Sequence, residues 1–160
     1  MKSLIFSFGY AFRGIYYALK YERNMRIHFV CMIYMYSFLL FTDFFVVSKT
    51  QLAVIFAMNA LVLSLELINT SVERAVDLAS DERSEKGRIA KDTAAGAVLI
   101  AAVFSVAAGI AVLWQPEAFS ALWNLFSNNI LKLALFIASI AAATVFIFKG
   151  FFKGSTEGDG

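Results

Sequence analysis

The chain has 160 residues, of which 60% are hydrophobic and 16% are charged, with a formal net charge of +2 and a mean hydropathy of +0.71. Soluble domains carry about 25% charged residues, so this composition excludes an ordinary soluble fold and indicates an integral membrane protein. One cysteine, Cys31, and one histidine, His28, exclude a disulfide framework within the chain, a cysteine-based zinc site and a histidine-rich metal site.

The first expected element is an amphipathic helix over residues 3–21 that lies on the membrane surface. Its apolar side chains recur at helical spacing, at Leu4, Phe8, Phe12, Ile15, Tyr16 and Leu19. The same spacing also fits a helix that packs on the protein's own core, and the two interpretations are compatible. Gly9 and Arg13 interrupt this segment, so we do not expect it to be a signal peptide.

Four apolar segments follow, each long enough for a helix that crosses the bilayer. The expected spans are residues 27–47, 52–72, 93–114 and about 130–148. The sequence therefore predicts an all-α membrane protein with a surface helix and four spans. Residues 115–129 are expected to be an interfacial segment on the outer surface, because they carry aromatic side chains suited to that position.

Small residues recur every four positions in the third span, at Ala97, Ala101, Ser105 and Gly109. This pattern allows helices to approach closely, so we expect this face inside a bundle. Three or four short helices enclose little volume, which favours a homo-oligomer.

The basic residues are distributed asymmetrically. Of the 14 Lys and Arg residues, all but Lys49 and Lys132 precede the first span, lie between the second and third spans, or follow the fourth. Since positive charge accumulates on the cytoplasmic side, we expect both termini and the 73–92 loop to face the cytoplasm.

The acids within this apolar chain are the main candidate functional residues. Glu66 lies in the second span with no basic residue within seven positions, and an unpaired carboxylate is costly in a membrane. Asn69, Glu73 and Asp77 follow it on one face of a helix. A solvated helix end accounts for Glu73 and Asp77 about as well, but solvation is not available at the depth of Glu66.

Carboxylates beside a lysine at a membrane surface fit metal-assisted phosphoryl transfer. Glu22 and Glu73 are expected to bind Mg²⁺, while Lys91, just before the third span, neutralises phosphate charge. Glu66, about 10 Å deeper along the helix, would accept the proton of the acceptor hydroxyl. Taken alone, Lys91 also fits an interfacial anchor, and His28 is more typical of a hydrogen-bonded interfacial residue than of a ligand.

Residues 66–70 read Glu-Leu-Ile-Asn-Thr, and Glu73, Asp77 and then Ala-Lys-Asp at 90–92 follow them. This pattern resembles the prokaryotic diacylglycerol kinase and undecaprenol kinase family, whose N-terminal pattern also matches Gly9, Tyr10, Gly14 and Glu22. The resemblance covers roughly residues 5–114. We therefore expect a lipid kinase domain over 1–114 and a C-terminal extension, 115–160, that carries the fourth span.

The resemblance implies a homotrimeric kinase of the bacterial inner membrane, with active sites that are shared between subunits and face the cytoplasm, and with no nucleic-acid partner. It implies MgATP as phosphoryl donor and Glu66 as catalytic base, with Asn69 orienting Glu66 or the lipid head group. The implied magnesium ligands are Glu22 and Glu73. The implied nucleotide contacts are Tyr10, Glu22, Glu73, Asp77, Glu82, Lys91 and Asp92.

Two short stretches, 22–28 and 93–97, resemble the undecaprenol kinase branch. The expected reaction is therefore transfer of the γ-phosphoryl group of MgATP to undecaprenol, giving undecaprenyl phosphate. One alternative is a diacylglycerol kinase that makes phosphatidic acid. An alternative of another class is a non-enzymatic membrane protein in transport or scaffolding, which the concentration of polar groups at the cytoplasmic edge disfavours. A lipid phosphatase is disfavoured because His28 is the only histidine.

Overall fold

A computed structural model describes residues 2–79 and 84–149. These residues form six α-helices. The helices are α1 (Lys2–Tyr21), α2 (Arg23–Phe41), α3 (Lys49–Ala79), α4 (Glu85–Leu113), α5 (Pro116–Ser127) and α6 (Ile130–Lys149). Helices α2, α3, α4 and α6 are long and apolar enough to cross a membrane, which confirms the predicted all-α membrane fold.

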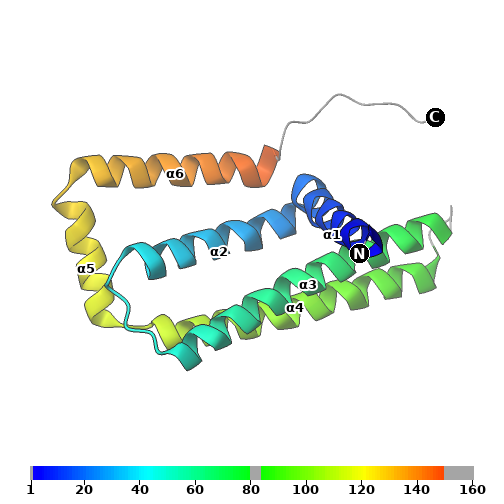
Figure 1. The fold of residues 1–160 in the computed structure, drawn as a ribbon, viewed down its shortest axis with the longest axis horizontal. Coiled ribbons are helices and arrows are strands. Elements are labelled where there is room, and N and C mark those ends of the chain that lie inside the picture. The colour runs from blue at the N-terminus through cyan, green and yellow to red at the C-terminus, as the bar shows by residue number, and fades with distance from the viewer. Residues whose placement is uncertain (1, 80–83, 150–160) are drawn as a thin grey trace.

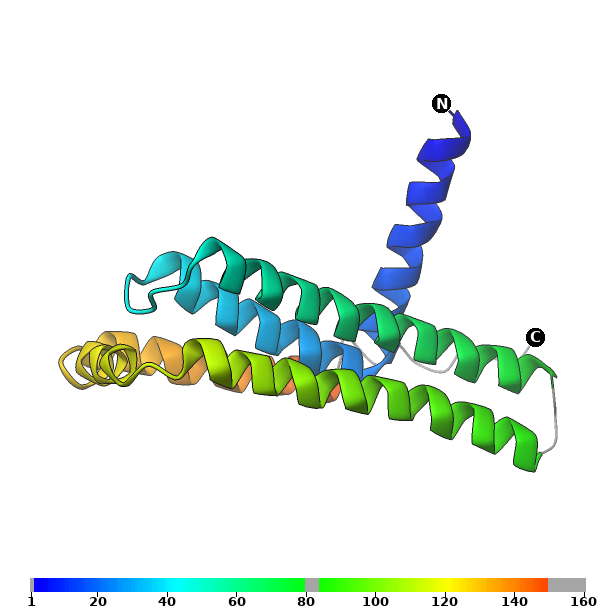
Figure 2. The same cartoon turned by 90° about the horizontal axis from the view of Figure 1, so that it is seen from below.

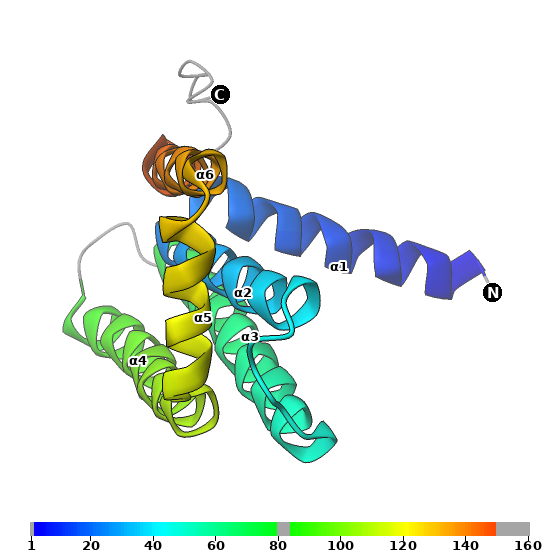
Figure 3. The same cartoon turned by 90° about the vertical axis from the view of Figure 1, so that its left-hand side faces the viewer.

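The four long helices run alongside one another, α5 lies across one end of them, and α1 projects away at a steep angle near the other end (Figures 1 and 2). Viewed along the long axis, α6 packs on α2, while α3 and α4 lie on the opposite side of α2 (Figure 3). The α1–α2 elbow, the C-terminal end of α3 and the start of α4 all lie toward the end from which α1 projects (Figure 1). This end carries the polar residues that the sequence singles out.

Helices α3 and α4 form a long hairpin that extends beyond α2 (Figures 1 and 2). A Cβ atom on Gly87 would lie 2.9 Å from Cγ1 of Val76, so a larger residue at this position in the first turn of α4 would require the Val76 side chain to shift. Further along α4, Ala101 is buried against α3, but Ala97 is exposed within the single chain. The row of small residues on α4, at Ala97, Ala101, Ser105 and Gly109, is therefore only partly covered by the chain's own helices.

Several helices are longer than the apolar segments that predicted them. Helix α3 continues to Ala79, and α4 begins at Glu85 after Ser84, whose side chain accepts a hydrogen bond from the Gly87 amide at 3.0 Å. Most of the expected 73–92 loop is thus helical, because polar residues can extend a helix once it leaves the bilayer. Helix α2 instead begins earlier, at Arg23, and ends at Phe41, where Thr42 adopts an extended backbone.

The segment beyond α4 folds back on the bundle. Helix α5 occupies the expected interfacial segment, and the Gln115 side chain before it binds both the amide and the carbonyl of Val46, at 3.0 and 3.1 Å. Helix α6 then runs antiparallel to α2 (Figure 1). The Tyr34 hydroxyl donates to Ser139 Oγ at 2.9 Å, and the Phe136 ring packs edge-on against Tyr34.

Candidate functional site

The polar stripe predicted on the second span is built on one continuous helix, α3. Glu66 is 2% exposed, and Asn69 and Thr70 are also buried. The Asn69 amide nitrogen donates to Oε1 of Glu73 at 2.9 Å, and the Thr70 hydroxyl donates to the backbone carbonyl of Glu66 at 3.0 Å. Asp77 continues the stripe on the exposed last turns of α3. The stripe therefore runs from a buried carboxylate to water.

Glu66 has a partner that the sequence pattern did not predict. Nε2 of His28, on α2, lies 3.4 Å from Oε1 of Glu66, and the His28 side chain is 26% exposed. A buried carboxylate is tolerated only where polar groups face it, so this contact accounts for the position of Glu66 inside the helix packing. His28 and Glu66 lie on different helices and far apart in the sequence, so no helical spacing relates them. Only the packing of α2 on α3 brings the two together.

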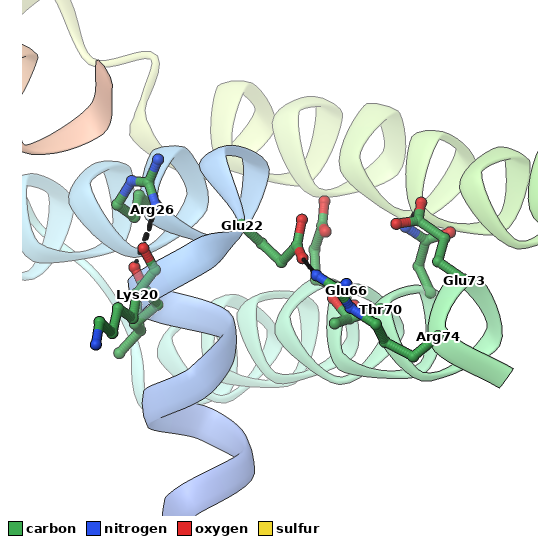
Figure 4. A network of polar contacts seen from close by, with 9 residues as sticks. Lys20, Glu22, Arg26, Glu66, Thr70, Glu73 and Arg74 are labelled. Atoms are coloured by element: carbon green, nitrogen blue, oxygen red, sulfur yellow. Dashed lines mark hydrogen bonds and ion pairs between the residues drawn. The ribbon is translucent and has the colours of Figure 1, made fainter. Parts of the chain in front are cut away.

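Glu22 lies at the elbow between α1 and α2, with φ −95° and ψ 118°. Its carboxylate points across to α3, where Oε1 lies 3.5 Å from Nη2 of Arg74 (Figure 4). The Arg74 guanidinium also lies 5.5 Å from the centre of the Tyr17 ring on α1. Arg74 thus joins α1, the elbow and α3. Arg74 occurs one turn after Thr70, but only the packing of α1 and α2 on α3 brings it to Glu22 and Tyr17.

Helices α3 and α4 are linked at the exposed end of the stripe. Lys91 Nζ donates to Oδ1 of Asp77 across the hairpin. Asp92 instead pairs with Arg88 on the same helix, at 2.9 Å. The structure therefore brings Lys91 to the stripe. Among the described residues, Asp92, the next residue of α4, pairs within its own helix and has no such contact with α3.

One expected nucleotide contact, Tyr10, is not brought to this cluster by the described chain. Tyr10 is 64% exposed on α1, where the Arg13 guanidinium lies 4.7 Å from the centre of its ring. Helix α1, to which Tyr10 belongs, projects away from the bundle (Figure 2). Glu82 lies outside the described residues.

A groove of about 410 Å³ lies between α1 and α3 beside this cluster. Its α1 wall includes Gly14 and Tyr17, and its α3 wall includes Leu67, Thr70 and Arg74. The groove is mainly apolar, and Thr70, Ser71 and Arg74 add polar groups to its lining, which suits a molecule with an apolar body and a polar group.

The donor atoms suit a hard cation held jointly with phosphate. Among the described residues, no three His, Cys, Asp or Glu side chains lie close enough to hold a metal by themselves. Glu22 and Glu73 nonetheless offer carboxylate oxygens from the elbow and from α3. Within the same residues, Oδ1 of Asn69 is buried without a hydrogen-bond partner. Mg²⁺ is commonly bound by one or two carboxylates plus substrate phosphates, so these oxygens fit a magnesium ion that arrives with a nucleotide.

Comparison with known proteins gives consistent matches. The sequence pattern of the family described as prokaryotic diacylglycerol kinase matches residues 9–113. A diacylglycerol kinase from Synechocystis sp. is 38% identical over 123 residues, which are 71% of this chain and 64% of that protein. An undecaprenol kinase from Bacillus subtilis is 36% identical over 108 residues, which are 66% of this chain and 84% of that protein. No solved structure matches.

The matched region contains α2, α3 and α4 and most of α1, together with Glu22, Glu66, Glu73 and Lys91. It covers well over half of the chain, and it leaves α5 and α6 outside. The chain belongs to the prokaryotic diacylglycerol kinase family, a family of membrane lipid kinases.

Proposed function

We propose that this protein is a lipid kinase that transfers the γ-phosphoryl group of MgATP to the hydroxyl of undecaprenol, giving undecaprenyl phosphate. The observation that carries the proposal is Glu66, a carboxylate that is 2% exposed at the inner end of a stripe leading out to Asn69, Glu73 and Asp77. A base at that depth can meet a lipid hydroxyl, while the exposed end of the stripe can meet a water-soluble nucleotide.

Glu66 acts as the general base. Its carboxylate takes the proton from the lipid hydroxyl as the oxygen forms a bond to the γ-phosphorus. The bond between that phosphorus and the β–γ bridging oxygen breaks, and ADP leaves with the bonding electrons. Asn69, one turn along α3, orients the lipid head group or Glu66. His28 holds the Glu66 carboxylate from the α2 side.

The nucleotide occupies the exposed end of the stripe. Glu22 and Glu73 would hold the magnesium ion, which would supply positive charge to neutralise the phosphates. Lys91, whose ammonium group already reaches across to Asp77, turns to the phosphates when they arrive. Asp77 and Asp92 complete the contacts from this side. The groove between α1 and α3 lies beside the same residues and suits the start of the lipid chain.

Each active site is shared between subunits of a homotrimer. The exposure of Tyr10 on a projecting α1, and the partly uncovered small residues of α4, support this arrangement, because the described residues of one chain leave both surfaces partly uncovered. Tyr10 and Glu82 would then reach the nucleotide of a neighbouring subunit. Light scattering of the detergent-solubilised protein would give the mass of a trimer, and a monomer mass would contradict the arrangement.

The protein lies in the bacterial inner membrane, with the active site and both termini in the cytoplasm. The placement of basic residues supports this orientation, since among the described residues only Lys49 and Lys132 lie at the other end. A membrane-impermeant lysine reagent should therefore modify Lys91 in inverted vesicles but not in intact cells.

Undecaprenol is the preferred acceptor because stretches 22–28 and 93–97 resemble the undecaprenol kinase branch. Stretch 22–28 also contributes His28, which contacts the proposed base. Diacylglycerol is the second candidate acceptor. It is retained because the chain is about as identical to a protein named diacylglycerol kinase as to one named undecaprenol kinase.

The test is direct phosphorylation. The full-length protein, purified in detergent, is supplied with magnesium and ATP labelled in the γ-phosphate, and undecaprenol and diacylglycerol are offered separately. We expect label in undecaprenol. Label only in diacylglycerol would show that the protein is a lipid kinase with diacylglycerol, and not undecaprenol, as its acceptor. Label in neither lipid would contradict the kinase proposal and favour a non-enzymatic membrane protein.

A further inference from the structure

Arg26 is a buried cation that binds only main-chain oxygens among the described residues. It lies in the first turn of α2 and is 6% exposed. Its guanidinium donates to the carbonyls of Leu19 and Lys20 at 3.4 and 2.9 Å, and to the carbonyl of Ile147 at 2.9 Å. Within the described part of the chain, no carboxylate lies within ion-pair distance of it.

These carbonyls belong to the last turns of two different helices, α1 and α6. The last carbonyls of a helix have no partner within the helix, and they carry the negative end of its dipole. One guanidinium therefore compensates two helix C-termini that meet at the same point. These carbonyls compensate the burial of the Arg26 guanidinium, and α1 and α6 are held to α2 through the same side chain.

Glu22 is the residue between α1 and α2, next to the carbonyl groups that Arg26 binds. Its amide donates to the Ala18 carbonyl at 2.8 Å, and its carbonyl accepts from the Arg26 amide at 3.3 Å. Arg26 points from the elbow toward α1 and α6, whereas Glu22 points the opposite way, toward Arg74 on α3 (Figure 4). The direction of the Glu22 carboxylate therefore depends on the angle between α1 and α2, which Arg26 fixes.

Helix α6 is held along its length and does not merely touch Arg26. The Tyr34–Ser139 hydrogen bond and the contact of Phe136 with Phe38 fasten it to α2 near its middle. Its last turn consequently has a fixed position when it meets Arg26. Yet α6 lies outside the region that matches the family, which ends at residue 113.

We propose that α6 supports the kinase site. Its Ile147 carbonyl binds the positioning residue Arg26, and Arg26 in turn fixes the elbow between α1 and α2 that presents Glu22 to the magnesium nucleotide. This inference rests on the proposed function for the role of Glu22. The junction itself does not depend on that role.

The test breaks the junction from the α6 side in the full-length protein. Phe148→Pro drives the preceding residue, Ile147, out of helical geometry and so turns its carbonyl away from Arg26. Phe148 is 68% exposed, and Phe148→Ala is the matched control because it keeps the helix. Arg26→Gln breaks the same junction from the α2 side, and Arg26→Lys restores the charge with fewer donors.

Two measurements decide the outcome. In hydrogen exchange, the amides of residues 22–26 should exchange several-fold faster in Phe148→Pro than in Phe148→Ala. In activity assays, Phe148→Pro and Arg26→Gln should raise the magnesium concentration for half-maximal rate several-fold and leave the KM for the lipid alcohol unchanged, with Arg26→Lys in between.

Each other result counts against the proposal. Equal exchange in the two Phe148 variants would show that α6 does not support the elbow. Faster exchange with an unchanged magnesium requirement would show that the elbow does not control the metal site. Parallel changes in kcat and both KM values, with a lower Tm, would mean a general packing role. If the wild-type protein phosphorylates no lipid, the proposed function fails, and the exchange comparison still decides whether α6 holds the elbow.

Discussion

Nε2 of His28 and Oε1 of Glu66 lie 3.4 Å apart between α2 and α3, and the Glu66 side chain is 3% accessible. The only histidine of the sequence thus faces the most deeply buried acid among the described residues. A carboxylate so placed needs a polar partner in the absence of substrate, and a lipid hydroxyl would approach the same oxygens during catalysis. The pair connects the stability of the helix packing with the chemistry proposed for Glu66.

Glu66→Gln should lower kcat by about 10²–10⁴-fold, because the amide keeps the shape of the side chain but cannot accept the proton of the acceptor hydroxyl. Binding of MgATP should change little, since Glu66 lies at the lipid end of the stripe. Labelled phosphate transfer and equilibrium nucleotide binding measure the two effects. Glu117→Gln on α5 is the control, and Glu66→Gln with most of its activity retained would refute the assignment of the base.

His28→Leu should destabilise the protein by about 1–3 kcal/mol, because it leaves the buried Glu66 carboxylate without its neighbour. The same substitution in a Glu66→Leu background should cost much less, since the carboxylate is then absent. Unfolding of the four proteins of this cycle in detergent gives the coupling energy. Strictly additive effects would show that the two side chains do not interact.

Glu73→Gln should raise the magnesium concentration needed for half-maximal rate, because one anionic oxygen is lost while the hydrogen bond from Asn69 can still form. A magnesium titration at saturating ATP measures the change. Glu85→Gln, an exposed acid in the first turn of α4, should titrate like the wild type. An unchanged requirement in Glu73→Gln would remove Glu73 from the metal site.

Lys91→Gln should raise the KM for ATP by about tenfold or more, the effect of losing a charged hydrogen bond to phosphate. The Tm should move little, because the Lys91–Asp77 pair is exposed and such pairs contribute little stability. Lys86→Gln provides the control on the same helix. A large drop in Tm without a change in the KM for ATP would identify Lys91 as a structural link between α3 and α4 instead.

The sequence alone predicted the all-α membrane class and the family, and the structure and the comparisons confirm both. Hydrophobic segments of membrane-spanning length require helices, because no other single segment satisfies its own hydrogen bonds in lipid. Helical periodicity likewise determined that Glu66, Asn69 and Glu73 share a face, since positions three and four residues apart must lie on one side. The roles assigned to these residues, and the trimer, stay predictions.

Contacts between helices were decided only by the tertiary structure. His28 meets Glu66, Glu22 meets Arg74, and Arg26 meets the carbonyl of Ile147 from 121 residues away. Such contacts depend on how the helices cross and on which end of one helix reaches the other. Local periodicity specifies the faces of each helix separately, but the choice among possible neighbours comes from the packing of all of them together.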